Sequence, residues 1–296
     1  MKLTIFEKFR NVTKCGKTIK QVFKYTDFKI GFILLLSILS ISVHGQFFIP
    51  ESYVRIGAFE PSQPPQGLNL LGTDSFGRDV YAQLSYSIAN SLIIGIMVAI
   101  IGTIVGSVVG FISGYYGGTL DAIVRIIINV MLSIPSLLLL LLIASFIKGA
   151  LDFVSVSLII GLFSWAWPAR QVRSQVLSLK EREFVNVAKL SGMKGYEIIF
   201  IEIMPHMFRW MTVHFISTIL YGILTESSLS VLGLGPQKNL TLGMMIYWAL
   251  NYAALYRGIW WWWTAPVIIL IILFLSLYLM NIGLERIMNP RLQRVG

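Results

Sequence analysis

The three histidines are the residues best suited to metal or general-base chemistry, and their spacing fits neither. His44, His206 and His214 are scattered along the chain and match no zinc motif. The GxxxxGK[ST] loop that cradles nucleotide phosphates does not occur, so we do not expect this chain to hydrolyse ATP itself. Composition leaves a Ser-His-Asp triad open, but no GxSxG nucleophile elbow occurs. The sequence therefore favours a protein that is not an enzyme.

A second group of charged residues closes the polar loop 51–79. Thr73, Asp74 and Ser75 are expected to cap a helix that begins there. Arg78 is expected to pair with Asp74 or Asp79.

Glu226 follows an apolar stretch and is the third candidate for chemistry. A carboxylate near a membrane edge costs roughly 0–3 kcal/mol, so it needs water or a partner. Two interpretations stay open: a hydrogen bond at a helix end or in a loop, and a place at the mouth of a transport pathway. No lone charge lies deep in an expected span, which argues against the ion relay of a secondary transporter.

These residues must be positioned by membrane helices. The chain has 296 residues, 56% hydrophobic and 13% charged, with a mean hydropathy of +0.74, which indicates a polytopic membrane protein. Six spans are expected, at residues 30–50, within the charge-free stretch between 79 and 121, and at 126–147, 153–169, 210–225 and 264–284.

Features inside these spans carry further expectations. Small residues recur at steps of three or four in the second span, which favours close helix packing: Ser87, Ser91, Gly95, Ala99, Gly102, Gly106, Gly110 and Gly114. Pro135 predicts a kink in the third span. Residues 236–257 are expected to be a loop with short amphipathic pieces. The tryptophans at 260–263 predict an interfacial anchor, with a cofactor-stacking box as the alternative.

The N-terminal residues 1–29 carry eight Lys and Arg against Glu7 and Asp27. Interleaved apolar residues predict a basic amphipathic segment on an anionic membrane surface. A signal peptide is the competing interpretation, disfavoured by the length of the basic stretch. The sole cysteine, Cys15, excludes an intrachain disulfide framework.

The distribution of charge predicts the orientation. With the N terminus inside and six spans, 19 of the 24 Lys and Arg lie on the inner side, against a nearly even split of Asp and Glu. The positive-inside rule therefore predicts that both termini and residues 181–205 are cytoplasmic.

Residues 181–205 form the longest segment that is too polar for a bilayer core, and we call them the elbow. Four residues share one face of a first helix: Phe184, Val187, Ala188 and Ser191. Gly192 falls where a helix end favours a left-handed residue, and a second helix is expected to run into Pro205. An ordinary solvated loop is the plainer alternative.

The elbow resembles the EAA loop of ABC-importer permeases. The slots of that loop hold Asn186-Val187-Ala188, Gly192 and Ile203-Met204-Pro205; the alanine, glycine and proline match, and the first two EAA positions do not. LLGTDSFGRDV at 70–80 resembles a signature of the C-type permease subunit of the dipeptide/oligopeptide importer family. GYYGGTLD at 114–121 and ESSLSVLGLG at 226–235 resemble further motifs of that family.

This resemblance implies an all-α polytopic membrane protein with six transmembrane helices, the type I ABC-importer permease fold and a cytoplasmic coupling helix. It implies a non-catalytic subunit in the plasma or inner membrane that pairs with a B-type permease. Two cytoplasmic ATP-binding subunits would hold ATP and Mg, an extracytoplasmic solute-binding protein would deliver cargo, and this chain would carry no cofactor or metal. The lipid bilayer is an expected partner, and nucleic acid is not expected to be one.

The resemblance also assigns residues. The candidates for coupling to the ATPases are Glu183, Asn186, Val187, Ala188, Leu190, Ser191, Gly192 and Met193, with Glu183 a substitute for the missing family glutamate. The small residue and the glycine are expected to let the backbone approach the ATPase closely. The family-motif residues are Gly72, Thr73, Asp74, Gly77, Arg78, Asp79 and Glu226.

The expected organisation begins with a basic cytoplasmic segment at 1–29, followed by a first helix and extracytoplasmic loop at 30–85. A five-helix core at 86–284, which includes the elbow, and a cytoplasmic tail at 285–296 complete the chain. Peptides are the expected cargo. Oligosaccharides, weakly suggested by the tryptophan run, and metal chelates are alternatives within the family. A self-contained channel or membrane enzyme is the alternative of another class.

Overall fold

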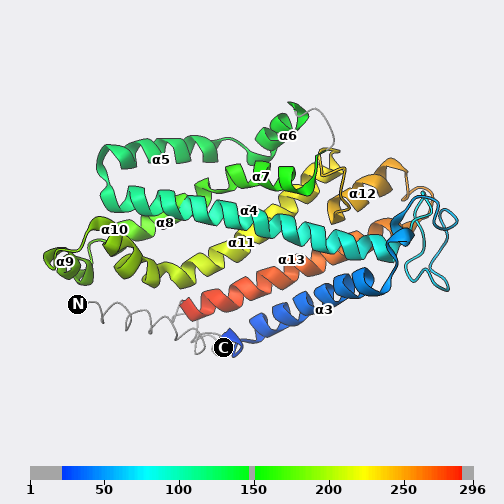
Figure 1. The fold of residues 1–296 in the computed structure, drawn as a ribbon, viewed down its shortest axis with the longest axis horizontal. Helices are drawn as coiled ribbons and strands as arrows, with labels where there is room; N and C mark the ends of the chain where they lie inside the picture. Colours follow the sequence, from blue (N-terminus) through cyan, green and yellow to red (C-terminus); the bar gives the residue numbers. More distant parts are fainter. Residues whose placement is uncertain (1–21, 147–150, 289–296) are drawn as a thin grey trace.

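The computed structural model describes residues 22–146 and 151–288, and within these ranges the chain is helical, with two isolated β-bridges and no strand (Figure 1). The helices are α3 (Thr26–Phe48), α4 (Val80–Tyr116), α5 (Gly118–Ser133), α6 (Ser136–Phe146), α7 (Phe153–Ser164), α8 (Ala166–Leu179), α9 (Glu183–Leu190), α10 (Gly195–Glu197), α11 (Met204–Val231), α12 (Leu242–Asn251) and α13 (Trp260–Met288). A 3₁₀-helix, η1 (Glu51–Val54), and a π-helix, η2 (Ile198–Ile203), complete the set. Cys15 and almost all of the predicted N-terminal basic segment lie outside the described residues, as do residues 289–296 of the C-terminal tail.

Four helical segments are long and apolar enough to cross a membrane: Thr26–Phe48, Val80–Tyr116, Phe153–Leu179 and Trp260–Arg286. Two bent pairs raise the number to six if each is one span. The first pair, α5 and α6, bends by 83° at Ile134 and Pro135, where the residue before the proline adopts an extended backbone. The kink predicted from Pro135 is therefore a full break. The described chain thus has four to six spans, a range that includes the predicted six.

Two predicted boundaries are wrong. The span expected to end at 169 continues through α8 to Leu179, because Pro168 lies in the first turn of α8, where no helical N–H is lost. The fifth span does not end at 225, since α11 continues to Val231. The short amphipathic piece expected within 236–257 is present as helix α12, which begins where the Thr241 side chain accepts a hydrogen bond from Met244 N–H at 3.2 Å.

The long helix α4 is the axis of the fold and packs against α3, α7, α8 and α11. Its small residues form the predicted contact face, which is buried along its length. A methyl group added at Gly106 would lie 2.7 Å from the Trp165 carbonyl oxygen, and one at Gly110 would lie 2.8 Å from that of Ala169. These glycines let the backbones of α4 and α8 touch, which is how helices associate in a solvent that does not reward apolar burial.

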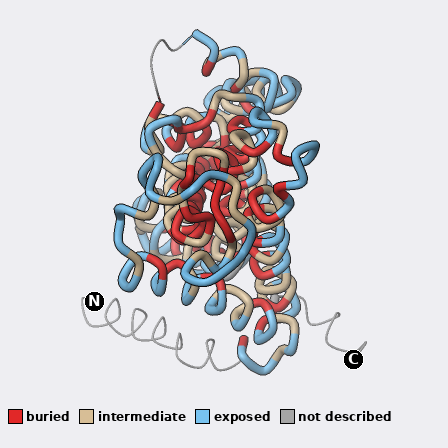
Figure 2. Tube along the Cα trace, turned by 90° about the vertical axis from the view of Figure 1, so that its right-hand side faces the viewer, coloured by how far each residue is buried: buried red, intermediate tan, exposed pale blue. Residues whose placement is uncertain are grey.

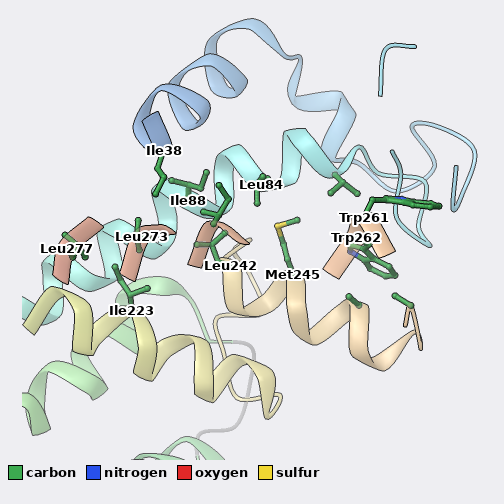
Figure 3. Close-up of a cluster of buried hydrophobic side chains, with 14 of the residues drawn as sticks. Ile38, Leu84, Ile88, Ile223, Leu242, Met245, Trp261, Trp262, Leu273 and Leu277 are labelled. Atoms are coloured by element: carbon green, nitrogen blue, oxygen red, sulfur yellow. The ribbon is translucent and has the colours of Figure 1, made fainter. Parts of the chain in front are cut away.

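Buried residues gather in the middle of the bundle and exposed residues surround them (Figure 2). The largest apolar cluster joins α3, α4, α11, α12 and α13, with Trp262 at one end and Leu277 at the other (Figure 3). A second cluster joins the end of α4 to α8, α9, η2 and the start of α11. The structure therefore has two opposite ends: α9 and α10 lie at one, and loop 51–79 and α12 lie at the other (Figure 1).

Candidate functional site

The elbow contains the two predicted helical pieces, and its inner face is fixed to the bundle. Val185 and Ala188 of α9 are buried in an apolar cluster that also contains Val176 of α8 and Ile198 and Ile203 of η2. The second piece does not stop at Pro205 as predicted, because the proline lies in the first turn of α11 and the helix continues through it. The elbow thus packs against the bundle through the buried face of α9.

The turn between the two pieces depends on Gly192. Its φ of +77° lies in the left-handed region, as predicted for this helix end. The N–H of Met193 donates to the Ala188 carbonyl at 3.2 Å, and the Lys194 N–H donates to the Glu197 carboxylate at 2.7 Å. These bonds close the end of α9 and begin α10.

The outward face of α9 is apolar at its centre. The Leu190 side chain is 89% exposed and that of Val187 is 61% exposed. The other exposed members of the predicted coupling set are Glu183, Asn186, Ser191 and Gly192, while Met193 is half-buried. Tyr196 is also exposed beside the turn, although it was not among the predicted coupling residues. The adjacent Gly195, which marks the turn, is the sequence feature that could have indicated it.

One predicted coupling residue points the wrong way for that role. Ala188 is 5% exposed and contacts its own chain, so it cannot let an ATPase approach the backbone as the resemblance implied. The physical reason is that α9 must bury Val185, and Ala188 follows it on the same helical face. Nor does Gly192 provide close approach within this chain, since a methyl group added there would meet no atom within 4 Å. The exposed knob is Leu190 with Val187.

At the other end of the molecule, Asp74 organises loop 51–79. Its buried carboxylate accepts hydrogen bonds from the backbone N–H groups of Phe76 at 2.8 Å and Arg78 at 2.9 Å. Arg78 Nε and the Gln83 amide donate to its second oxygen at 2.7 Å and 3.0 Å. Of the two predicted pairings of Arg78, the structure contains the one with Asp74. The carboxylate is satisfied by four donors, which is what its burial requires.

The other signature residues support the same loop. Thr73 donates to the Glu60 carbonyl at 2.7 Å and accepts from the Gln63 N–H at 2.8 Å. Gly72 and Gly77 both have φ near +70°, at +70° and +71°. A methyl group at Gly72 would lie 2.6 Å from the Gln63 carbonyl oxygen, so only glycine fits. The signature therefore has a structural explanation in this chain.

The predicted helix cap is wrong by several residues. Thr73, Asp74 and Ser75 do not cap α4; Asp79 does, accepting from the Ala82 N–H at 2.6 Å. Asp74 is instead committed to the loop by its four donors. Burial raises the pKa of the Asp79 carboxyl above its ordinary value, and the Ala82 hydrogen bond opposes that rise.

Glu226 lies inside α11, fully buried, because the helix continues past the predicted end. Its carboxylate accepts from the hydroxyls of Ser230 at 2.6 Å and Thr241 at 2.7 Å, with Ser227 at 3.4 Å. Of the two interpretations of Glu226, the structure contains the hydrogen-bonded one. Thr241 also caps α12, so Glu226 connects the end of α11 to the start of α12.

The tryptophan run divides between two environments. Trp260 is exposed, as an interfacial anchor would be, but Trp261 and Trp262 are buried in the protein. The Trp261 indole N–H donates to the Thr73 carbonyl at 3.0 Å, and Trp262 lies in the largest apolar cluster (Figure 3). The anchor prediction is therefore wrong for these two, which lock loop 51–79 onto α13.

Neither end of the molecule brings histidines or carboxylates together for metal chemistry. His44 lies 3.0 Å from the Tyr81 hydroxyl, His206 stacks near Phe184, and His214 packs on Trp210. Within residues 22–146 and 151–288, no cluster of three or more His, Cys, Asp or Glu is placed to hold a metal ion.

Comparison with known proteins adds a family to this geometry. The family described as "Binding-protein-dependent transport system inner membrane component" matches residues 106–294. The dipeptide transport system permease protein DppC of Bacillus subtilis is 32% identical over 268 residues, 89% of this chain and 82% of that protein. A putative peptide transport system permease protein of Brucella abortus is 29% identical over 282 residues, 94% of this chain and 93% of its own length. The oligopeptide transport system permease protein OppC of Mycobacterium tuberculosis is 30% identical over 199 residues, 67% of this chain and 68% of that protein.

The Glu226 contacts generate a prediction about stability. Glu226→Ala leaves the hydroxyls of Ser230 and Thr241 without their acceptor in a buried site, which should lower the free energy of unfolding by about 1–3 kcal/mol. Glu226→Gln keeps the size and one acceptor oxygen and should cost less. Thermal unfolding of the purified protein in detergent measures both.

Exposed Glu51 provides the matched control, since Glu51→Ala should change the free energy of unfolding by no more than about 0.5 kcal/mol. Equal unfolding midpoints for Glu226→Ala and Glu51→Ala would contradict the structural role of Glu226.

Proposed function

Because this chain belongs to the family of binding-protein-dependent transport system inner membrane components, we propose that it is a permease subunit of an ATP-driven importer of peptides. The peptide assignment is supported by the names of the relatives, which are dipeptide, peptide and oligopeptide transport permeases. The weak sequence hint for oligosaccharides came from residues 260–263, and it loses force because Trp261 and Trp262 are buried.

The coupling role is supported by one feature of α9: apolar side chains are exposed on its outer face while its inner face is buried. Leu190 and Val187 present apolar surface to solvent at the end of α9, while Val185 and Ala188 anchor the same helix in the core. Leu190 and Val187 together form an apolar patch at the tip of the elbow, and such a patch is suited to contact with a partner protein. We assign that partner as a cytoplasmic ATPase subunit, with ATP and Mg held there and not in this chain.

The orientation is part of the proposal. The excess of Lys and Arg on the elbow side supports a cytoplasmic elbow and cytoplasmic termini. Loop 51–79 and α12, at the opposite end of the molecule, would then face the solute-binding protein outside the membrane (Figure 1).

The mechanism that follows is alternating access with a homologous B-type permease. ATP binding closes the ATPase pair and displaces the elbow. The displacement enters the bundle through the apolar cluster that α9 shares with α8, η2 and the end of α4. The spans of the two permeases then rock so that the cavity between them opens outward to receive cargo, and ATP hydrolysis resets the arrangement.

Our first functional prediction concerns the knob. Leu190→Asp should weaken the ATPase complex by about 2 kcal/mol or more, since it places a carboxylate where an apolar contact is buried on docking. The measurement is co-purification of the ATPase subunits with the tagged permease, together with cargo uptake in membrane vesicles.

Leu68→Asp is the matched control, because Leu68 is 81% exposed at the other end of the molecule. This variant should retain the ATPase subunits in full. The coupling assignment fails if Leu190→Asp retains them equally well.

A second prediction tests the orientation. In a Cys15→Ser background and in cells that lack the ATPase subunits, Leu68→Cys should react with a membrane-impermeant maleimide added to intact cells, and Leu190→Cys should react only after the membrane is opened. The opposite pattern would reverse the topology and remove the elbow from the cytoplasm.

A third prediction tests the cargo. Proteoliposomes that contain this chain, the partner permease and the two ATPases, supplied with the binding protein, should take up labelled oligopeptides in an ATP-dependent manner. Excess unlabelled peptide should compete, while oligosaccharide and nickel chelate should not. Competition by sugar or chelate alone would identify a different cargo class while leaving the permease role intact.

A further inference from the structure

Helix α5 is attached to the rest of the bundle by little apolar contact. Ile128 is its one buried residue, and the remainder of its side chains are exposed or half-buried. It packs chiefly against α4 and α8 and lies along one side of the bundle, away from α3 and α13 (Figure 1). Few apolar side chains are therefore buried where α5 meets α8.

An ion pair between Asp121 and Arg173 connects α5 to α8. Arg173 of α8 donates from Nε to one oxygen of the Asp121 carboxylate and from Nη2 to the other, the latter at 2.6 Å. The Asp121 side chain is 15% exposed and that of Arg173 is 18% exposed, so water screens the ion pair only in part. This two-bond fork fixes both the distance and the angle between the two side chains.

The backbone changes direction at both ends of α5. At its start, Gly117 and Gly118 have φ of +68° and +61°, and a methyl group added at Gly118 would meet no atom within 4 Å. At its end, the extended backbone of Ile134 and the following Pro135 separate it from α6 at 83°. Helix α5 is thus a rod with a backbone break at each end and an ion pair near its first turn.

The other partner in the ion pair leads directly to the elbow. Arg173 lies in α8, which ends at Leu179 a few residues before α9 begins. A methyl group at Gly114 of α4 would lie 3.0 Å from the Arg173 carbonyl oxygen, so α8 is held against α4 at this same point. Any displacement of the elbow that moves α8 is therefore presented to α5 at Asp121.

We propose that the Asp121–Arg173 ion pair is the positioning contact through which displacement of the elbow reaches α5 and, beyond the break, α6. This inference rests on the proposed coupling role of the elbow. It gives Asp121, the acidic residue of the GYYGGTLD motif, a task in coupling: it converts motion of α8 into motion of α5, with no contact to cargo or nucleotide.

The test is the number of cargo molecules imported per ATP hydrolysed, measured in proteoliposomes that contain the complete transporter. Asp121→Asn and Arg173→Gln should each lower this ratio about fivefold or more while the ATPase subunits stay bound and hydrolyse ATP. The reversed pair, Asp121→Arg with Arg173→Asp, should return the ratio to within about twofold of the unmodified protein, because the fork is restored. A contact that only stabilised the fold would change yield and unfolding midpoint but not this ratio.

Arg173→Lys keeps the cation but loses the planar two-bond fork, and it decides the matter if the neutral variants do not accumulate. It should also lower the ratio. Arg170→Gln removes an exposed cation from α8, the helix that carries Arg173, so it is the matched control and should leave the ratio unchanged. An unchanged ratio in Arg173→Lys and in any neutral variant that accumulates, or a reversed pair no better than the single variants, overturns the proposal.

The elbow variant Leu190→Asp, assayed in the same series, separates this inference from the function on which it rests. If Leu190→Asp abolishes coupled uptake and the ion-pair variants do not alter it, the ion-pair proposal alone fails. If Leu190→Asp leaves coupled uptake intact, the elbow does not couple this chain to the ATPase subunits, and both proposals fail.

Discussion

The close approach of α4 and α8 is the contact on which the rest of the structure depends. Helices in a bilayer gain little from burying apolar side chains against each other, so backbone contact has to hold them together. Gly106, Gly110 and Gly114 permit that contact because any side chain there would strike α8. Since α8 continues towards α9, the same contact also seats the elbow. Packing and force transmission therefore share one helix pair.

Two buried carboxylates perform the corresponding task at the opposite end. Asp74 and Glu226 are each enclosed by donors from several segments, so burial does not leave their charge unsolvated. Asp74 holds loop 51–79 to the start of α4, and Glu226 holds α12 to the end of α11. The irregular segments at this end are therefore held in place by side-chain hydrogen bonds to the helices they join.

The elbow combines two opposite requirements in one short helix. Val185 and Ala188 face inward and attach α9 to the bundle. Leu190 faces outward and offers an apolar contact surface to the proposed partner. A helix satisfies both because its side chains radiate on all sides. The Asp121–Arg173 pair extends the same logic to α5, where charge replaces apolar burial as the means of attachment.

The sequence alone determined the helical membrane class, the packing stripe of α4, the left-handed turn at Gly192 and the identity of the motifs, because composition, periodicity and glycine act locally. It did not reveal that Asp79 caps α4, that Glu226 lies inside α11 or that Trp261 and Trp262 are buried. Each of these depends on a partner distant in the sequence or on where a helix ends. Which face of α9 turns inward was likewise decided only by tertiary packing, because neighbouring apolar residues compete for burial and the bundle offers room on one side.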